Sequence, residues 1–175
     1  MKQLKKTFFI LLAIFVVQSC GVRVNYNLSG GNVGTAKTFQ VPLFQNYSSQ
    51  SAGSTFEPGL DQDFTRSLQD LINNQTSLDY VPSNGDLVYE GEIVEYRISP
   101  MTATANQTAA QNRLTIAVNV RFTNNTKEDA TFEQRFSFFF DYPANSLLQS
   151  VKTQAHEEIF ERINQDIFSK SLGDW

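Results

Sequence analysis

The sequence contains one cysteine, Cys20, and one histidine, His156, and both scarcities limit its chemistry. A single cysteine excludes an intramolecular disulfide framework, and one histidine with no second thiol provides too few ligands for a zinc site. A Ser-His-Asp triad would have to be built on His156, which lies in a helical pattern beside Glu157 and Glu158, and the chain has no nucleophile elbow. We therefore expect a protein without catalytic activity, metal or cofactor, in which His156 is a surface helix residue.

The chain also lacks an excess of positive charge and a phosphate-binding loop. It has 14 Lys and Arg against 18 Asp and Glu. Nucleic-acid binding requires dense positive charge, so we expect no nucleic-acid partner. Gly30, Gly31 and Gly34 precede a strand pattern and not a helix, which excludes the usual loop that binds phosphate at a helix N-terminus.

No apolar run reaches the roughly 20 residues that a membrane-spanning helix needs. The longest, residues 8–17, follows three lysines and stands shortly before Ser19 and Cys20. A positive start and a short apolar run are typical of a secretory signal, and a cysteine at this place is typical of a bacterial lipobox. We interpret residues 1–19 as a lipoprotein signal peptide and Cys20 as the acylated mature N-terminus. An ordinary cleaved signal is the alternative, but it leaves an odd thiol unexplained.

The mature chain would be acidic and of single-domain size. Without residues 1–19 it would have 156 residues, with eleven Lys and Arg against eighteen Asp and Glu, a net charge of −7. Electrostatics would not hold such a chain on an anionic membrane, so we expect the acyl chains on Cys20 to attach it. We predict a lipidated tether with a short strand at 20–36 and one domain at 37–175.

Two segments have helical spacing of apolar residues. Residues 57–75 place Leu60, Phe64, Leu68, Leu71 and Ile72 on one face, and acidic residues near the start favour a helix N-terminus. Residues 145–172 form the longer pattern. Its apolar stripe consists of Leu148, Val151, Ala155, Ile159, Ile163 and Ile167.

Four segments have strand character: 37–45, 86–98, 113–123 and 131–142. In the first, Phe39, Val41 and Leu43 alternate, and Pro42 predicts an edge or an end nearby. In the second, the alternation slips near Ile93 and Val94, which indicates a β-bulge. The third alternates most regularly, with one apolar and one polar face, as in a sheet with one face in water.

The order of these segments is strand, helix, three strands, helix. The first helix connects two strands that can lie parallel, and the last three strands form a meander. We predict an α+β fold: a two-layer sandwich of two amphipathic helices on one face of a mixed four-stranded sheet. Loops 46–56 and 99–112 are the expected contact loops, because long irregular segments in a compact domain are often functional.

The whole mature chain resembles the LptE family (in its LptC-related branch) of outer-membrane lipopolysaccharide-assembly lipoproteins. The resemblance rests on the order and spacing of several segments, none of which is diagnostic alone. They are CGVRVNYNLSG, KTFQVPLFQN, LDQDFTRSLQDLINNQTSL, NGDLVYEGEIVEY, NRLTIAVNVRFTNN, FEQRFSFFFDY and EEIFERINQDIFSKSLGDW. The resemblance implies the same two-layer fold.

The resemblance also implies a function. Members of this family are non-catalytic plugs of the outer-membrane β-barrel LptD, whose assembly they assist, and they support insertion of lipopolysaccharide into the outer leaflet. The protein would be anchored through Cys20 in the periplasmic leaflet of the outer membrane, since residues 21–25 lack the acidic run of some surface lipoproteins. The lipopolysaccharide contacts that it suggests are Arg97, Arg113, Arg121 and Arg135, which would otherwise be ordinary exposed charges.

Two other functions fit the sequence. One is a freestanding periplasmic lipoprotein that acts as a lipid- or glycan-binding scaffold with the same fold. The other is a secreted adhesin subunit rich in phenylalanine, of which the chain has 15. Retention in membranes that depends on Cys20 would exclude the adhesin.

Overall fold

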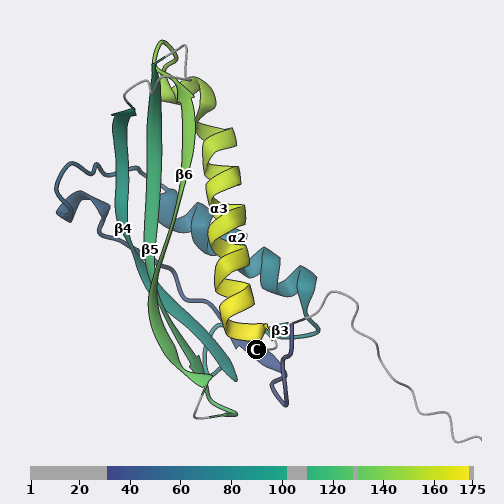
Figure 1. Ribbon diagram of the computed structural model, residues 1–175. Coiled ribbons are helices and arrows are strands. Elements are labelled where there is room, and N and C mark those ends of the chain that lie inside the picture. The colour runs from purple at the N-terminus through teal and green to yellow at the C-terminus, as the bar shows by residue number, and fades with distance from the viewer. Residues whose placement is uncertain (1–30, 102–109, 128–129, 174–175) are drawn as a thin grey trace, which may run out of the picture.

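A computed structural model describes residues 31–101, 110–127 and 130–173. In this part of the chain one twisted sheet is covered on one face by two α-helices, α2 (Leu60–Gln75) and α3 (Leu148–Leu172) (Figure 1). The predicted α+β class and the two-layer arrangement are confirmed. The predicted signal peptide, Cys20 and most of the tether lie outside the described residues.

The sheet has six strands and not the predicted four. They are β1 (Thr38–Gln40), β2 (Gln45–Asn46), β3 (Asp79–Tyr80), β4 (Leu87–Met101), β5 (Gln111–Asn124) and β6 (Phe132–Pro143). Their order is β3-β1-β4-β5-β6, and β2 also pairs with β4. The pairs of β1 with β3 and β4, and of β2 with β4, are parallel, whereas β4, β5 and β6 are antiparallel, so the predicted mixed sheet and meander are confirmed.

The extra strands arise on either side of α2. The predicted strand 37–45 is divided at Pro42, which has no N–H to donate to a ladder. After this break Phe44 is fully buried and Leu43 is 49% exposed, so the predicted alternation is wrong at Leu43. The helix begins at Leu60 instead of 57, after Gly59 in a left-handed conformation (φ 80°).

The predicted β-bulge lies in β4 between Ile93 and Glu95, where the register with β5 shifts. The bulge adds one residue to β4, so the side chains that face the helices change from odd-numbered positions before it to even-numbered positions after it. Ile93 is buried on the helix side before the bulge and Tyr96 after it, so both large side chains join the core. Without the shift, Tyr96 would point to the opposite face.

The core lies between the sheet and the two helices. The rings of Phe44 (just before β2), Phe64 (in α2) and Phe160 (in α3) form a chain, with centroid separations of 5.0 and 5.4 Å. Full burial of each such side chain contributes about 1.5–3 kcal/mol. At Gly91 of β4 only glycine fits, because a Cβ there would lie 2.6 Å from Cε1 of Phe44 and closer still to the Asn119 carbonyl of β5. The ring of Phe44 is therefore packed directly against the backbone of β4.

Candidate functional site

The four arginines suggested as ligand contacts share one surface, the sheet face opposite α2 and α3, which we call the outer face. On β5 the buried side chains of Leu114, Ile116 and Val118 point toward the helices. The alternate positions of the three long strands therefore point outward. They include Arg97 from β4, Arg113 and Arg121 from β5, and Arg135 from β6.

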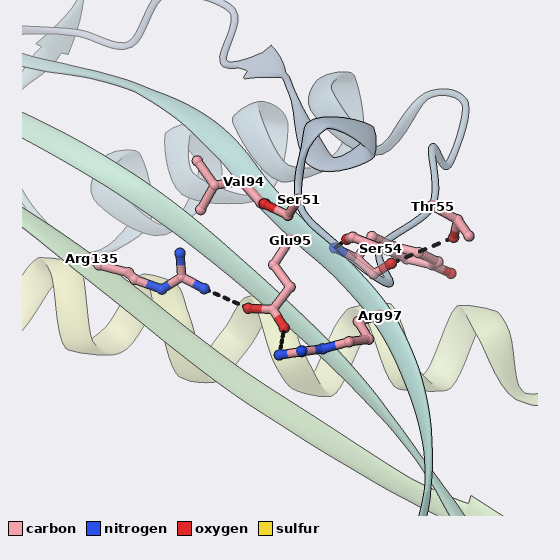
Figure 2. Close-up of polar contacts among 8 residues, drawn as sticks. Ser51, Ser54, Thr55, Val94, Glu95, Arg97 and Arg135 are labelled. Atoms are coloured by element: carbon pink, nitrogen blue, oxygen red, sulfur yellow. Dashed lines mark hydrogen bonds and ion pairs between the residues drawn. The ribbon is translucent and has the colours of Figure 1, made fainter.

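Two of these arginines converge on one carboxylate. The Nη2 atom of Arg135 donates to Oε2 of Glu95 at 2.5 Å, and Nη2 of Arg97 contacts Oε1 (Figure 2). The Glu95 side chain is 8% exposed, whereas the two arginine side chains are about half exposed. The carboxylate therefore lies beneath two guanidinium groups whose other N–H groups face solvent.

The loop at 47–55, which includes the short helix η1 (Ser48–Gln50), binds the edge of β4 beside this cluster. The hydroxyl of Ser51 donates to the Val94 carbonyl at 2.5 Å, and Thr55 N–H donates to the Tyr96 carbonyl at 2.9 Å. The Tyr96 N–H donates in turn to the Ser54 hydroxyl at 2.6 Å, and Figure 2 shows the loop running alongside β4. The loop thus continues the sheet where β2 ends and fixes the bulged segment that carries Glu95.

A second cluster consists of Arg113 near the start of β5 and of Phe139 and Asp141 near the end of β6. Nε and Nη2 of Arg113 each donate to one oxygen of Asp141, both at 2.7 Å. This bidentate pair raises the pKa of the Arg113 guanidinium. The same guanidinium lies 3.5 Å from the ring centroid of Phe139, which is 40% exposed. Arg113 is therefore held rigidly by a carboxylate and an aromatic face.

The remaining arginine, Arg121, lies between two glutamates of the neighbouring strands. It is opposite Glu90 on one side and Glu133 on the other, and its Nε lies 3.9 Å from the Glu90 carboxylate with both side chains half exposed. The outer face is thus uneven in charge. Positive side chains gather toward the Arg97 and Arg113 end, and carboxylates toward the Glu90 end.

Sequence reasoning identified the arginines but not their partners. Glu95, Asp141 and Phe139 were not singled out, because their roles depend on cross-strand register. The bulge near Ile93 was the one signal that could have placed Glu95 and Arg97 on the outer face, and not on the helix side with Ile93.

On the helix side, the expected surface residue His156 is partly buried. Its Nε2 lies 3.1 Å from the hydroxyl oxygen of Tyr96, and the two rings meet edge to face at 5.7 Å. Burial lowers the pKa of His156 below 6.5, against the opposing effect of Glu57, while Lys152 lowers it further. Burial likewise raises the pKa of the Tyr96 hydroxyl. The pair is a packed contact between β4 and α3.

Three surface hollows accompany these features. The first, about 730 Å³, lies at the end of α3 and is lined by Lys127, Lys170 and several polar groups. The second, about 420 Å³, lies between α2 and α3 beside the ion pair of Glu57 and Lys152, which is 2.8 Å long. The third, about 440 Å³, is bounded by β6 and α3.

Two further properties bear on function. No helix that the structure describes has a stretch long and apolar enough to cross a membrane. Within 31–101, 110–127 and 130–173, no group of three or more His, Cys, Asp or Glu side chains could hold a metal ion.

A family model described as LptE, lipopolysaccharide-assembly, matches residues 36–171. The match begins just before β1 and ends in the last turn of α3, so it covers every helix and strand described above. No curated protein matches the chain.

Several solved structures are similar in fold. A hypothetical protein, CT253, from Chlamydia trachomatis is 9% identical with a TM-score of 0.51, over 79% of this chain and 99% of that one. A minor lipoprotein from Acinetobacter baumannii is 12% identical with a TM-score of 0.47, over 77% and 91%. Rare lipoprotein B from Shewanella oneidensis is 13% identical with a TM-score of 0.39, over 75% and 89%.

Proposed function

Because the chain belongs to the LptE lipopolysaccharide-assembly family, we propose that it plugs the outer-membrane β-barrel LptD and assists the assembly of that barrel. In this role it supports the insertion of lipopolysaccharide into the outer leaflet without catalysing a reaction. The observation that carries the proposal is the family match over residues 36–171, which spans the folded domain.

The anchor in this proposal is Cys20, acylated after removal of residues 1–19 and inserted in the periplasmic leaflet of the outer membrane. Its position relative to the domain is supported by the start of the described chain. The Asn32 N–H donates to the Leu172 carbonyl at 2.6 Å, so the tether meets the domain at the end of α3. Cys20 and Gly31 have ten residues between them, and the eleven Cα–Cα steps reach at most about 35–40 Å. The domain would therefore stay close to the membrane surface.

The outer face supports a role in lipopolysaccharide contact. Arg97, Arg113 and Arg135 are held in place by carboxylates and still expose donor groups, which suits phosphate recognition. Arg121 stands apart among Glu90 and Glu133. We propose all four as contacts and expect Arg121 to contribute least, because the adjacent carboxylates repel an anion.

Co-purification tests the plug. The chain would be tagged after Trp175 and extracted from native outer membranes in mild detergent, with a Cys20→Ala variant as control. The proposal predicts a large β-barrel in equal amount with the wild type, and a chain lost from the membrane fraction in the variant. Recovery of the acylated chain alone would contradict the plug and favour the freestanding scaffold.

Lipopolysaccharide contact is tested separately with the purified mature chain. An Arg97→Gln, Arg135→Gln double variant should bind purified lipopolysaccharide at least about tenfold more weakly, if each removed charge contributes about 1 kcal/mol. The matched control is Arg66→Gln together with Arg162→Gln, which removes the same charge from the helix layer. Equal weakening in both variants would contradict a specific outer-face site.

A further inference from the structure

The strand β6 forms a long free edge of the sheet. It has 12 residues, and in the described chain it pairs with β5 alone. At the other end of the sheet the outermost strand, β3, has only two residues. A long unpaired edge is a template for strand pairing with another chain, and natural proteins usually protect such edges.

Two adjacent phenylalanines of β6 stack on one another. The ring centroids of Phe138 and Phe139 are 5.4 Å apart with an angle of 18° between the planes. Neighbouring residues of a strand point to opposite faces of the sheet, so their rings normally lie far apart. Stacking therefore requires both rings to lean around one edge of the strand. Because β5 lies along one edge, the free edge is the one that leaves room for them.

An arginine lies on each side of the ring pair. The guanidinium of Arg113 lies 3.5 Å from the Phe139 centroid on the outer face, and that of Arg162 in α3 lies 5.7 Å from the Phe138 centroid. Each arginine also pairs with a carboxylate, Asp141 at 2.7 Å and Asp166 at 3.6 Å. The four side chains form a column that crosses the edge from the outer face to α3.

The edge would otherwise suit a second copy of the chain. Two antiparallel registers pair most of β6 with itself while matching faces. The register centred on Ser137 would set Glu133 opposite Asp141, which repel. The register centred on Phe138 would set Arg135 opposite Asp141 and Phe136 opposite Phe140, which attract.

The ring pair stands at the centre of this favourable register. Farther along β6, a hollow of about 440 Å³ lined by Gln134 and Phe136 lies between the strand and α3, so the helix does not fill the space beside the strand there. We propose that the Phe138–Phe139 column closes the free edge of β6 against pairing with a second copy of this chain. The column thereby keeps the protein monomeric before it meets its partner.

The test is the association state of the purified mature chain in a non-ionic detergent. Detergent-corrected light scattering would be measured up to about 100 µM, a range in which exposed edges associate. The wild type should remain a monomer, and a Phe138→Ser, Phe139→Ser variant should associate. Backbone amides of 132–143 should then exchange at least about tenfold more slowly in the associated form.

Matched variants distinguish association through the edge of β6 from association caused by general destabilisation of the fold. Phe56→Ser with Leu147→Ser removes two apolar side chains outside β6 that are 55% and 78% exposed, and should leave a monomer. Ser137→Lys added to the Phe138 and Phe139 variant should restore the monomer, because an edge lysine opposes pairing. Arg113→Gln with Arg162→Gln keeps both rings but removes the two guanidinium groups that contact them. This variant should associate, but more weakly than the variant without the rings.

Two results would overturn the proposal. One is a folded ring variant that remains monomeric over the whole concentration range. The other is association that leaves the amides of 132–143 unprotected, or that Ser137→Lys does not reverse. Circular dichroism shows whether the ring variant folds. If it does not fold, the Arg113→Gln, Arg162→Gln variant decides, and a strictly monomeric state of that variant overturns the proposal.

Discussion

Tyr96 of β4 and His156 of α3 meet between the sheet and the helix layer, with the tyrosine oxygen 3.1 Å from Nε2. The contact depends on the bulge after Ile93, which directs Tyr96 toward the helices. The Nε2 atom of a neutral imidazole can accept a hydrogen bond from the tyrosine hydroxyl. Protonation of His156 would remove this acceptor and place a charge in a half-buried site.

This contact predicts a pH dependence of stability. Burial depresses the pKa of His156 in the folded state below the unfolded value of 6.5. As the pH falls through 6.5 the unfolded chain binds a proton more readily than the folded chain, so stability is lost. The urea midpoint of the wild type should therefore fall between pH 7.5 and 5.5, and it should fall less in His156→Gln. Parallel decreases in both proteins would refute this assignment.

Glu95 is predicted to stabilise the outer face. In Glu95→Gln the two arginines lose their shared anion and repel each other, but both are half exposed and water solvates them in part. We expect a loss of about 1–2 kcal/mol in the free energy of unfolding, measured by urea denaturation.

The control for Glu95 is Glu90→Gln, whose partner Arg121 lies 3.9 Å away in a half-exposed pair. That change should cost less than about 0.5 kcal/mol. An equal loss in the free energy of unfolding for Glu90→Gln and Glu95→Gln would contradict this prediction. It would mean that the buried position of Glu95 beneath Arg97 and Arg135 adds no stability.

Gly91 is predicted to be irreplaceable for steric reasons. Its conformation is an ordinary extended one, but a Cβ would collide with the Phe44 ring and the Asn119 carbonyl. Gly91→Ala should lower the free energy of unfolding by about 2–4 kcal/mol, because β4 must move away from β5 or Phe44. Ser99→Ala, in the same strand on the outer face, should change it by less than about 0.5 kcal/mol. A well-tolerated Gly91→Ala would show that the Phe44 ring and the β4–β5 pairing can adjust at little cost.

The elements with long periodic patterns could be predicted from the sequence. Both helices and the three long strands were located, and the buried faces of β5 and α3 were assigned correctly, because burial selects apolar residues at regular spacing. The short strands β1, β2 and β3 could not be resolved, since two or three residues carry no period. They form because a neighbouring strand is present: β1 and β2 pair with β4, and β3 pairs with β1.

The candidate site was predictable in its residue types and not in its pairing. The four arginines were proposed one by one, Arg121 and Arg135 from strand faces and the other two from beside the loop at 99–112. That all four share the outer face is seen only in the structure. That Arg97 and Arg135 share Glu95 follows from a bulge and from the register of three strands, which local sequence does not encode. The burial of His156 escaped prediction for the same reason, because its partner lies 60 residues away.

A role in lipopolysaccharide assembly is tested by the amount of lipopolysaccharide at the cell surface after depletion of the chain, with plasmid copies of the wild type or Cys20→Ala. On depletion, surface lipopolysaccharide should fall and internal lipopolysaccharide should rise. The wild type, but not Cys20→Ala, should restore the surface level. Unchanged surface lipopolysaccharide after complete depletion would contradict it.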